Sequence, residues 1–91
     1  MKIVKRINPK PDFSIVCVRW IDSCEPRDNS EIEVHDIPRP QLLVNVGFLI
    51  KEEEDYVSLA GSHKKELSTF DYVISIPKES ITEIFYLYRK K

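Results

Sequence analysis

The sequence predicts an all-β domain, a small, strongly bent five-stranded antiparallel barrel. Four to five segments rich in β-branched and aromatic residues follow one another at close spacing. Tight polar turns separate several of them, and no stretch has the periodicity of a long amphipathic helix. We expect residues 1–91 to form a single domain, with a thin core that leaves little room for a deep enzyme cleft.

The first two predicted strands differ in how their apolar residues alternate. In Ser14–Asp22, one face is expected to carry three apolar side chains, those of Val16, Val18 and Trp20. Leu42–Ile50 is apolar on both faces, which suits burial on one side and a partner or second sheet on the other. Gly47 inside this strand indicates a bend or bulge, the device by which small sheets curl into barrels.

The three remaining strands are predicted at Tyr56–Ala60, Phe70–Ile76 and Ile81–Tyr88. The second of these has four apolar residues at alternate positions, which places them on one face: Phe70, Tyr72, Ile74 and Ile76. Pro77 ends that strand because proline has no N–H to donate to the ladder.

Three of the four connections between the predicted strands are informative. Lys51–Asp55 is a charged hairpin loop, and His63–Thr69 is a polar connection that forms a short helical turn or a hairpin tip. Ser23–Gln41 is the longest, and within it Ile32 and Val34 fit a short edge strand or a helical turn. A connection of this length in a small domain is usually functional or contains a further element.

Charge is balanced overall but unevenly placed, with a net charge of −1. Residues 1–20 and 61–91 are basic, whereas residues 21–60 are acidic, so one small body can present a basic and an acidic face. The balance excludes a generally basic nucleic-acid coat protein. No apolar run reaches the length of a membrane span or a signal-peptide core, so we expect a cytoplasmic domain with no membrane partner.

The residues that could carry chemistry form no recognisable motif. Two cysteines are too few for a disulfide scaffold, and the four residues that could ligate zinc lack a paired spacing: Cys17, Cys24, His35 and His63. No nucleophile has an evident base and orienting group. We therefore expect no metal, no cofactor and no enzymatic activity.

Two segments resemble the sequence motifs of a known family. The hairpin Val46–Ile50, an acidic turn and Tyr56–Leu59 resembles the first Sm motif, and Val73–Ile84 resembles the second. The chain is similar to small phage-type members of the Sm-like superfamily, which includes Sm, LSm and Hfq proteins. An SH3-like barrel is the alternative fold. The resemblance implies rings of subunits joined by edge-strand pairing, and RNA binding by two turns that line the pore, here Lys51–Asp55 and Pro77–Ser80.

The match to the family's RNA site is incomplete. The first turn carries four consecutive acids, Glu52–Asp55, where the family has an Asp and an Asn, and acids repeated around a ring would repel phosphate. Among the positions that correspond to the family's RNA-contacting residues, Lys78 is the only one with a suitable charge. Away from the pore, the best candidates for phosphate contact are the N-terminal bases and the tail, which serve equally as solubilising charge: Lys2, Lys5, Arg6, Lys10 and Arg89–Lys91.

Two functions remain open at this point. The first is a non-enzymatic, oligomeric Sm-like protein that binds RNA or a protein partner. The second is a structural or assembly adaptor of phage type, which uses the barrel as an interaction module and binds no nucleic acid.

Overall fold

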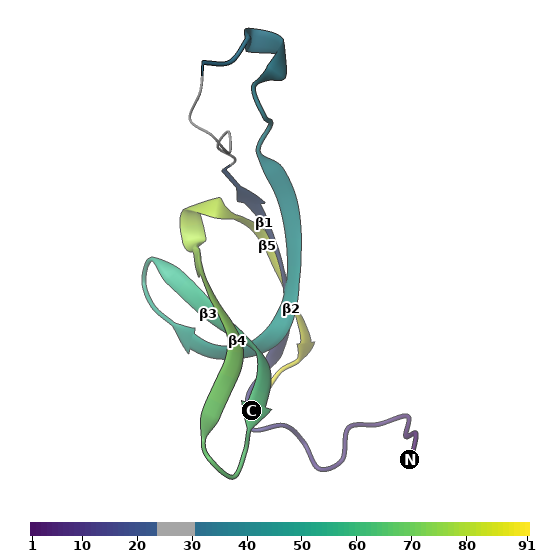
Figure 1. Ribbon diagram of the computed structural model, residues 1–91. Helices are drawn as coiled ribbons and strands as arrows, with labels where there is room; N and C mark the ends of the chain where they lie inside the picture. The colour runs from purple at the N-terminus through teal and green to yellow at the C-terminus, as the bar shows by residue number, and fades with distance from the viewer. Residues whose placement is uncertain (24–30) are drawn as a thin grey trace.

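The computed structural model describes residues 1–23 and 31–91 and has an antiparallel sheet of five strands (Figure 1). These are β1 (Ile15–Asp22), β2 (Gln41–Glu52), β3 (Tyr56–Lys64), β4 (Thr69–Pro77) and β5 (Ile81–Tyr88). Two short 3-10 turns accompany them, η1 (Val34–Asp36) before β2 and η2 (Lys78–Ser80) between β4 and β5. The predicted all-β class and the five strands are confirmed. No helix in the described part of the chain is long and apolar enough to cross a membrane.

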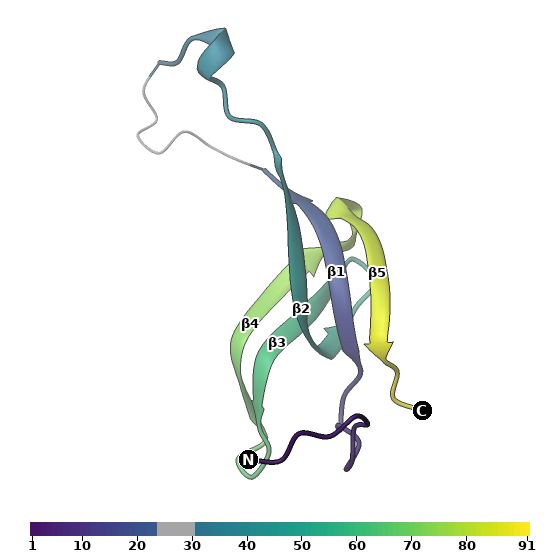
Figure 2. The ribbon, with the colours of Figure 1, turned by 90° about the vertical axis from the view of Figure 1, so that its right-hand side faces the viewer.

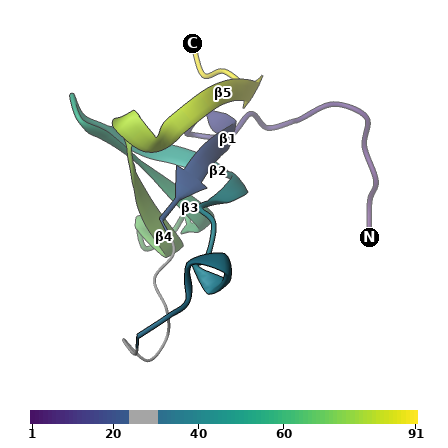
Figure 3. The ribbon, with the colours of Figure 1, turned by 90° about the horizontal axis from the view of Figure 1, so that it is seen from above.

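The strands lie in the order β4-β3-β2-β1-β5, which Figure 2 shows from left to right. β1 pairs with β2 on one side and with β5, from the other end of the sequence, on its other side. The sheet is curved, and a view along it places β4 and β5 at opposite margins (Figure 3). β4 and β5 are therefore the two edge strands.

β2 is shared between the two halves of the sheet. Its residues 41–48 pair with β1, and its residues from Phe48 onward pair with β3, with a register shift between Leu49 and Lys51. A Cβ on Gly47 would lie 2.7 Å from the Ala60 carbonyl oxygen of β3, a distance that no real Cβ tolerates. The glycine predicted to mark a bend thus lies where β2 passes from one partner to the other, and the bulge follows just after it.

The core lies on one face of this curved sheet. It is formed by buried side chains from β1, β3 and β4, namely Val16, Val18, Trp20, Val57, Leu59 and Ile76. The predicted core face of β1 is confirmed. Trp20 donates its indole N–H to the Asn45 side-chain oxygen at 2.7 Å, so the one polar atom of this large ring has a partner.

Two details of the strands differ from the sequence prediction. In His63–Thr69, the hairpin tip that was one of the predicted alternatives is confirmed at residues 65–68, but β3 runs on to Lys64 and β4 already begins at Thr69. The predicted shared face of β4 also fails at one position. Tyr72 has a φ of 56°, and its side chain is 86% exposed, whereas Ile76 is fully buried. Left-handed backbone at Tyr72 interrupts the alternation that the sequence pattern assumes.

The long connection contains the helical turn that was one of its predicted alternatives. η1 includes Val34, while Ile32 lies outside any regular element. Cys24 lies outside the described residues.

An aromatic cluster fixes the point at which the N-terminal segment leaves the sheet. The Phe13 ring meets the rings of His63 and Phe70 edge-on, each at 5.3 Å between centroids. His63 and Phe70 are directly paired across β3 and β4 and stack at 4.9 Å. These contacts tie residue 13 to the β3–β4 hairpin, and residues 1–12 extend away from it (Figure 1).

We expect Gly47→Ala to lower the free energy of unfolding by about 1–3 kcal/mol, because the added methyl collides with backbone of the adjacent strand. Denaturant unfolding of the two proteins measures this difference. Gly61→Ala is the matched control, since its Cβ would meet the Tyr72 Cβ at the longer distance of 3.0 Å, and a smaller loss is expected. Equal stability of Gly47→Ala and wild type would contradict the close approach of β2 and β3.

Candidate functional site

The two turns that the family resemblance singles out lie together in the structure. Tyr56 and Pro77 are directly paired across β3 and β4, and the Lys78 backbone N–H donates to the Asp55 carbonyl oxygen at 2.8 Å. The hairpin is also closed by the Glu53 N–H, which donates to the Tyr56 carbonyl at 2.8 Å. These backbone contacts bring the β2–β3 turn and η2 to the same end of the sheet.

The surface at this end is acidic. A shallow depression of about 600 Å³ is lined by Glu53, Glu54, Asp55 and Tyr56. The Lys78 ammonium lies 4.0 Å from a Glu52 carboxylate oxygen, and Lys51 lies 3.6 Å from a Glu53 oxygen. Both lysines of the two turns are thus within reach of carboxylates, and the acids outnumber them. A phosphate group entering here would meet net negative charge.

Lys51 also contacts an aromatic ring. Its ammonium lies 5.6 Å from the centroid of the Tyr56 ring, which is within the range of a cation–π contact. The Tyr56 side chain, and after it the Glu53 carboxylate, raise the pKa of the Lys51 ammonium above its usual value. Lys51 was predicted in the hairpin loop, but β2 runs on to Glu52, so Lys51 lies at the end of that strand, where its charge partly offsets the neighbouring acids.

The N-terminal bases lie far from Lys78. Lys2, Lys5, Arg6 and Lys10 are exposed on the segment that precedes β1. Lys10 lines a shallow pocket of about 380 Å³ at the end of β5, together with Pro11, Tyr88, Arg89, Lys90 and Lys91. The length of β5 separates this pocket from η2, roughly 25 Å at 3.3 Å per residue. The five predicted phosphate-contacting residues thus do not form one surface.

The residues considered for zinc are also separated. Cys17 is half-buried on β1, His35 is exposed on η1, and His63 belongs to the aromatic cluster with Phe13 and Phe70. Among the residues that the structure describes, no three His, Cys, Asp or Glu side chains gather in a group able to hold a metal ion.

The feature that sequence analysis missed is the exposure of β5. Four consecutive residues of this edge strand are between 38% and 61% exposed: Ile84, Phe85, Tyr86 and Leu87. They point to both faces of the strand, so the exposure is not confined to one side of the sheet. The run of apolar residues without alternation was visible in the sequence, but an edge strand and a doubly buried strand give the same pattern.

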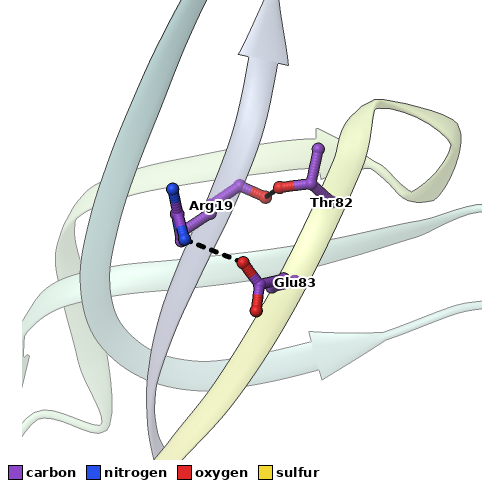
Figure 4. Close-up of polar contacts among 3 residues, drawn as sticks. All are labelled: Arg19, Thr82 and Glu83. Carbon is purple, nitrogen blue, oxygen red and sulfur yellow. Dashed lines mark hydrogen bonds and ion pairs between the residues drawn. The ribbon is translucent and has the colours of Figure 1, made fainter.

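β5 is held on the sheet by polar contacts to β1 as well as by its ladder (Figure 4). Arg19 donates to the Glu83 carboxylate at 2.8 Å, and the Thr82 hydroxyl donates to the Arg19 carbonyl oxygen at 3.1 Å. These contacts lie beside the register shift between Arg19 and Trp20. The position of the strand is therefore fixed while its apolar side chains stay exposed.

The apolar surface continues from β5 across the outer face of the sheet. Cys17 of β1 lies between Phe85 of β5 and Val46 of β2 in the ladder register, so the three side chains share a face. Val44 and Val46 are both more than half exposed. The prediction that the second strand is apolar on both faces is confirmed, with Leu43 and Leu49 packed on the core and the valines outside.

β4, the edge strand at the opposite margin, also exposes apolar side chains. On β4, Tyr72 and Val73 are exposed, with Val73 at 53%. Exposed apolar side chains on an unpaired edge are typical of strands that pair with another chain.

Comparison with protein-family models, with characterised proteins and with solved structures finds no match to the chain.

We predict that Lys78→Ala leaves the affinity for single-stranded RNA at low salt unchanged within about twofold, because the Glu52 carboxylate 4.0 Å from this ammonium and the acidic turn beside it already oppose phosphate. Neutralising the turn with Glu53→Gln, Glu54→Gln and Asp55→Asn should raise that affinity, since the repulsive charges are removed. Fluorescence anisotropy with a labelled oligonucleotide measures both effects. Tight, salt-sensitive binding that is lost in Lys78→Ala would show instead that the two turns form an RNA site.

Proposed function

We propose that this chain is a non-enzymatic, Sm-like β-barrel protein that forms homo-oligomers by pairing β5 of one copy with β4 of the next. The observation that carries the proposal is the edge strand β5, with Ile84, Phe85, Tyr86 and Leu87 exposed in the isolated chain. An edge strand presents unpaired N–H and C=O groups, and soluble proteins usually protect such edges with charge, proline or a covering segment. β5 has one acid, Glu83, already paired with Arg19, and no proline.

The topology supports pairing between different edges. Since β4 and β5 lie at opposite margins of the curved sheet, the contact would join two different surfaces of identical copies. Such a heterologous contact closes into a ring when the rotation between copies divides a full turn. Burial of the exposed β5 side chains would supply the hydrophobic part of the binding free energy, and the added ladder would satisfy the backbone groups.

The charge distribution favours a protein partner over RNA at the two turns. The acids of Glu52–Asp55 outnumber Lys51 and Lys78 there, and a ring would bring several copies of that acidic surface together. We therefore place this chain with assembly proteins that use the barrel as an interaction module, and the phage-type adaptor is its closest functional class. An SH3-like adaptor that acts as a monomer is the second candidate, supported by the same acidic turn.

We expect the wild-type chain to form a multimer, and the double variant Phe85→Lys with Leu87→Lys to be a monomer. Both positions are exposed, so the lysines are tolerated in the isolated chain but oppose burial against a neighbouring strand. Size exclusion with light scattering gives the mass, and circular dichroism verifies that the sheet is retained.

Glu66→Lys is the matched control, because it changes the net charge by the same two units at the exposed tip of the β3–β4 hairpin. It should leave the mass unchanged. A monomeric wild type would remove the Sm-like ring and favour the SH3-like adaptor.

A further inference from the structure

Two segments project from opposite ends of the sheet (Figures 1 and 2). One is the N-terminal arm, residues 1–12, which leaves the β3–β4 hairpin at Phe13. The other, called here the β1–β2 protrusion, consists of residues 31–40, which precede β2. They lengthen the molecule to 54 Å along its longest axis and give a radius of gyration of 17.1 Å, against about 12 Å for a compact domain of this length.

The N-terminal arm is both basic and apolar. It carries Lys2, Lys5, Arg6 and Lys10 against a single acid, Asp12. Its apolar side chains are exposed, with Ile3 at 85%, Val4 at 55% and Ile7 at 49%. No ion pair within the described residues involves any of the four bases. Within the described residues, the arm therefore presents four bases without an ion-pair partner and apolar side chains that are largely exposed.

The β1–β2 protrusion has the opposite charge and the same kind of exposure. Its described part carries Glu31, Glu33 and Asp36 against Arg39. Three of its apolar side chains are also exposed: Ile32, Val34 and Ile37. Val34 is 83% exposed although it lies on the 3-10 turn η1. The arm and the protrusion thus complement each other in charge, and both gain from burying apolar side chains.

From these observations we propose that the N-terminal arm of one copy docks on the β1–β2 protrusion of a second copy, so that copies associate head to tail. The two segments start at opposite ends of the sheet, which makes a neighbouring copy the natural partner for each. The contact joins two different surfaces and leaves one free arm and one free protrusion for the next copy. It rests on the proposed function in that its partner is a second copy, and it uses neither β4 nor β5.

In the proposed contact the arm is the basic partner and the protrusion the acidic one. Two charge-reversal variants and their mixture therefore test it. In the arm variant, Lys2→Glu, Lys5→Glu and Arg6→Glu make the arm acidic. In the protrusion variant, Glu31→Lys, Glu33→Lys and Asp36→Lys make the protrusion basic. Each variant alone then has an arm and a protrusion of like charge. We expect each to associate at least about tenfold more weakly than wild type at low salt.

An equimolar mixture of the two variants should recover association. The acidic arm of the first fits the basic protrusion of the second, and the native arm of the second fits the native protrusion of the first. Sedimentation and light scattering of each variant and of the mixture give the masses. Glu54→Lys, Glu66→Lys and Glu79→Lys together are the control for the protrusion variant, because they change the net charge by the same amount at exposed positions outside both segments.

Folding is checked separately from association. Trp20 is the only tryptophan and lies in the core, so its emission reports whether the sheet is intact in every variant. Both altered segments lie outside the sheet, and unchanged emission is expected.

The outcomes separate this contact from the edge pairing. Loss of association in both variants with recovery in the mixture supports the contact, even where Phe85→Lys with Leu87→Lys leaves the mass unaltered. Wild-type mass in both variants overturns it, while the edge variant can still become monomeric. Weak association in the mixture also overturns the contact. So does an arm variant that keeps the wild-type mass and loses only its binding to an oligonucleotide.

Discussion

The double use of β2 is the constraint on which the rest of the structure depends. One 12-residue strand supplies the ladder for β1 along its first part and for β3 along its last part. This is feasible because Gly47 has no side chain where the Ala60 carbonyl of β3 approaches. The transfer curves the sheet around Trp20 and Leu59, so the core forms on the inner face. It also determines that β4 and β5 remain at the two margins.

Alternation of apolar residues predicted the strands well wherever one face is buried and the backbone is regular. Val16, Val18 and Trp20 are the clearest case, because β1 lies at the centre of the core. The pattern failed at Tyr72, since a residue with positive φ changes the direction of the side chain without any trace in the apolar periodicity. It also ended β3 too early. The polar residues Ser62, His63 and Lys64 belong to that strand because their partners on β4 complete the ladder.

The candidate site was less predictable than the fold, for a reason that concerns edges. The sequence indicates that Ile81–Tyr88 forms a strand. The position of this strand in the sheet, however, depends on its pairing with β1, which lies far from it in the sequence. Exposure of Phe85 or Leu87 follows only from that position. The turns at Lys51–Asp55 and Pro77–Ser80 were identified through the family resemblance, and the Lys78–Asp55 backbone contact places them together. The acidic run Glu52–Asp55 was visible in the sequence, and the structure adds that Glu52 lies 4.0 Å from Lys78, whereas Lys10 of the N-terminal arm lies at the other end of β5.

The pairing of β1 with β5 has a consequence for how the chain reaches its folded state. Cys17 and Phe85 are paired across about three quarters of the sequence, and the Lys90 backbone N–H donates to the Ser14 hydroxyl at 3.0 Å. The three hairpin-like pairings from β1 to β4 join neighbours in sequence and can form early, whereas the last ladder requires a long loop to close. During synthesis, β1 would keep one side unpaired until the final strand has left the ribosome. Because the start of β1 lies beside the end of β5, a short linker could join these two points. The chain termini could then be moved to another turn without breaking a ladder.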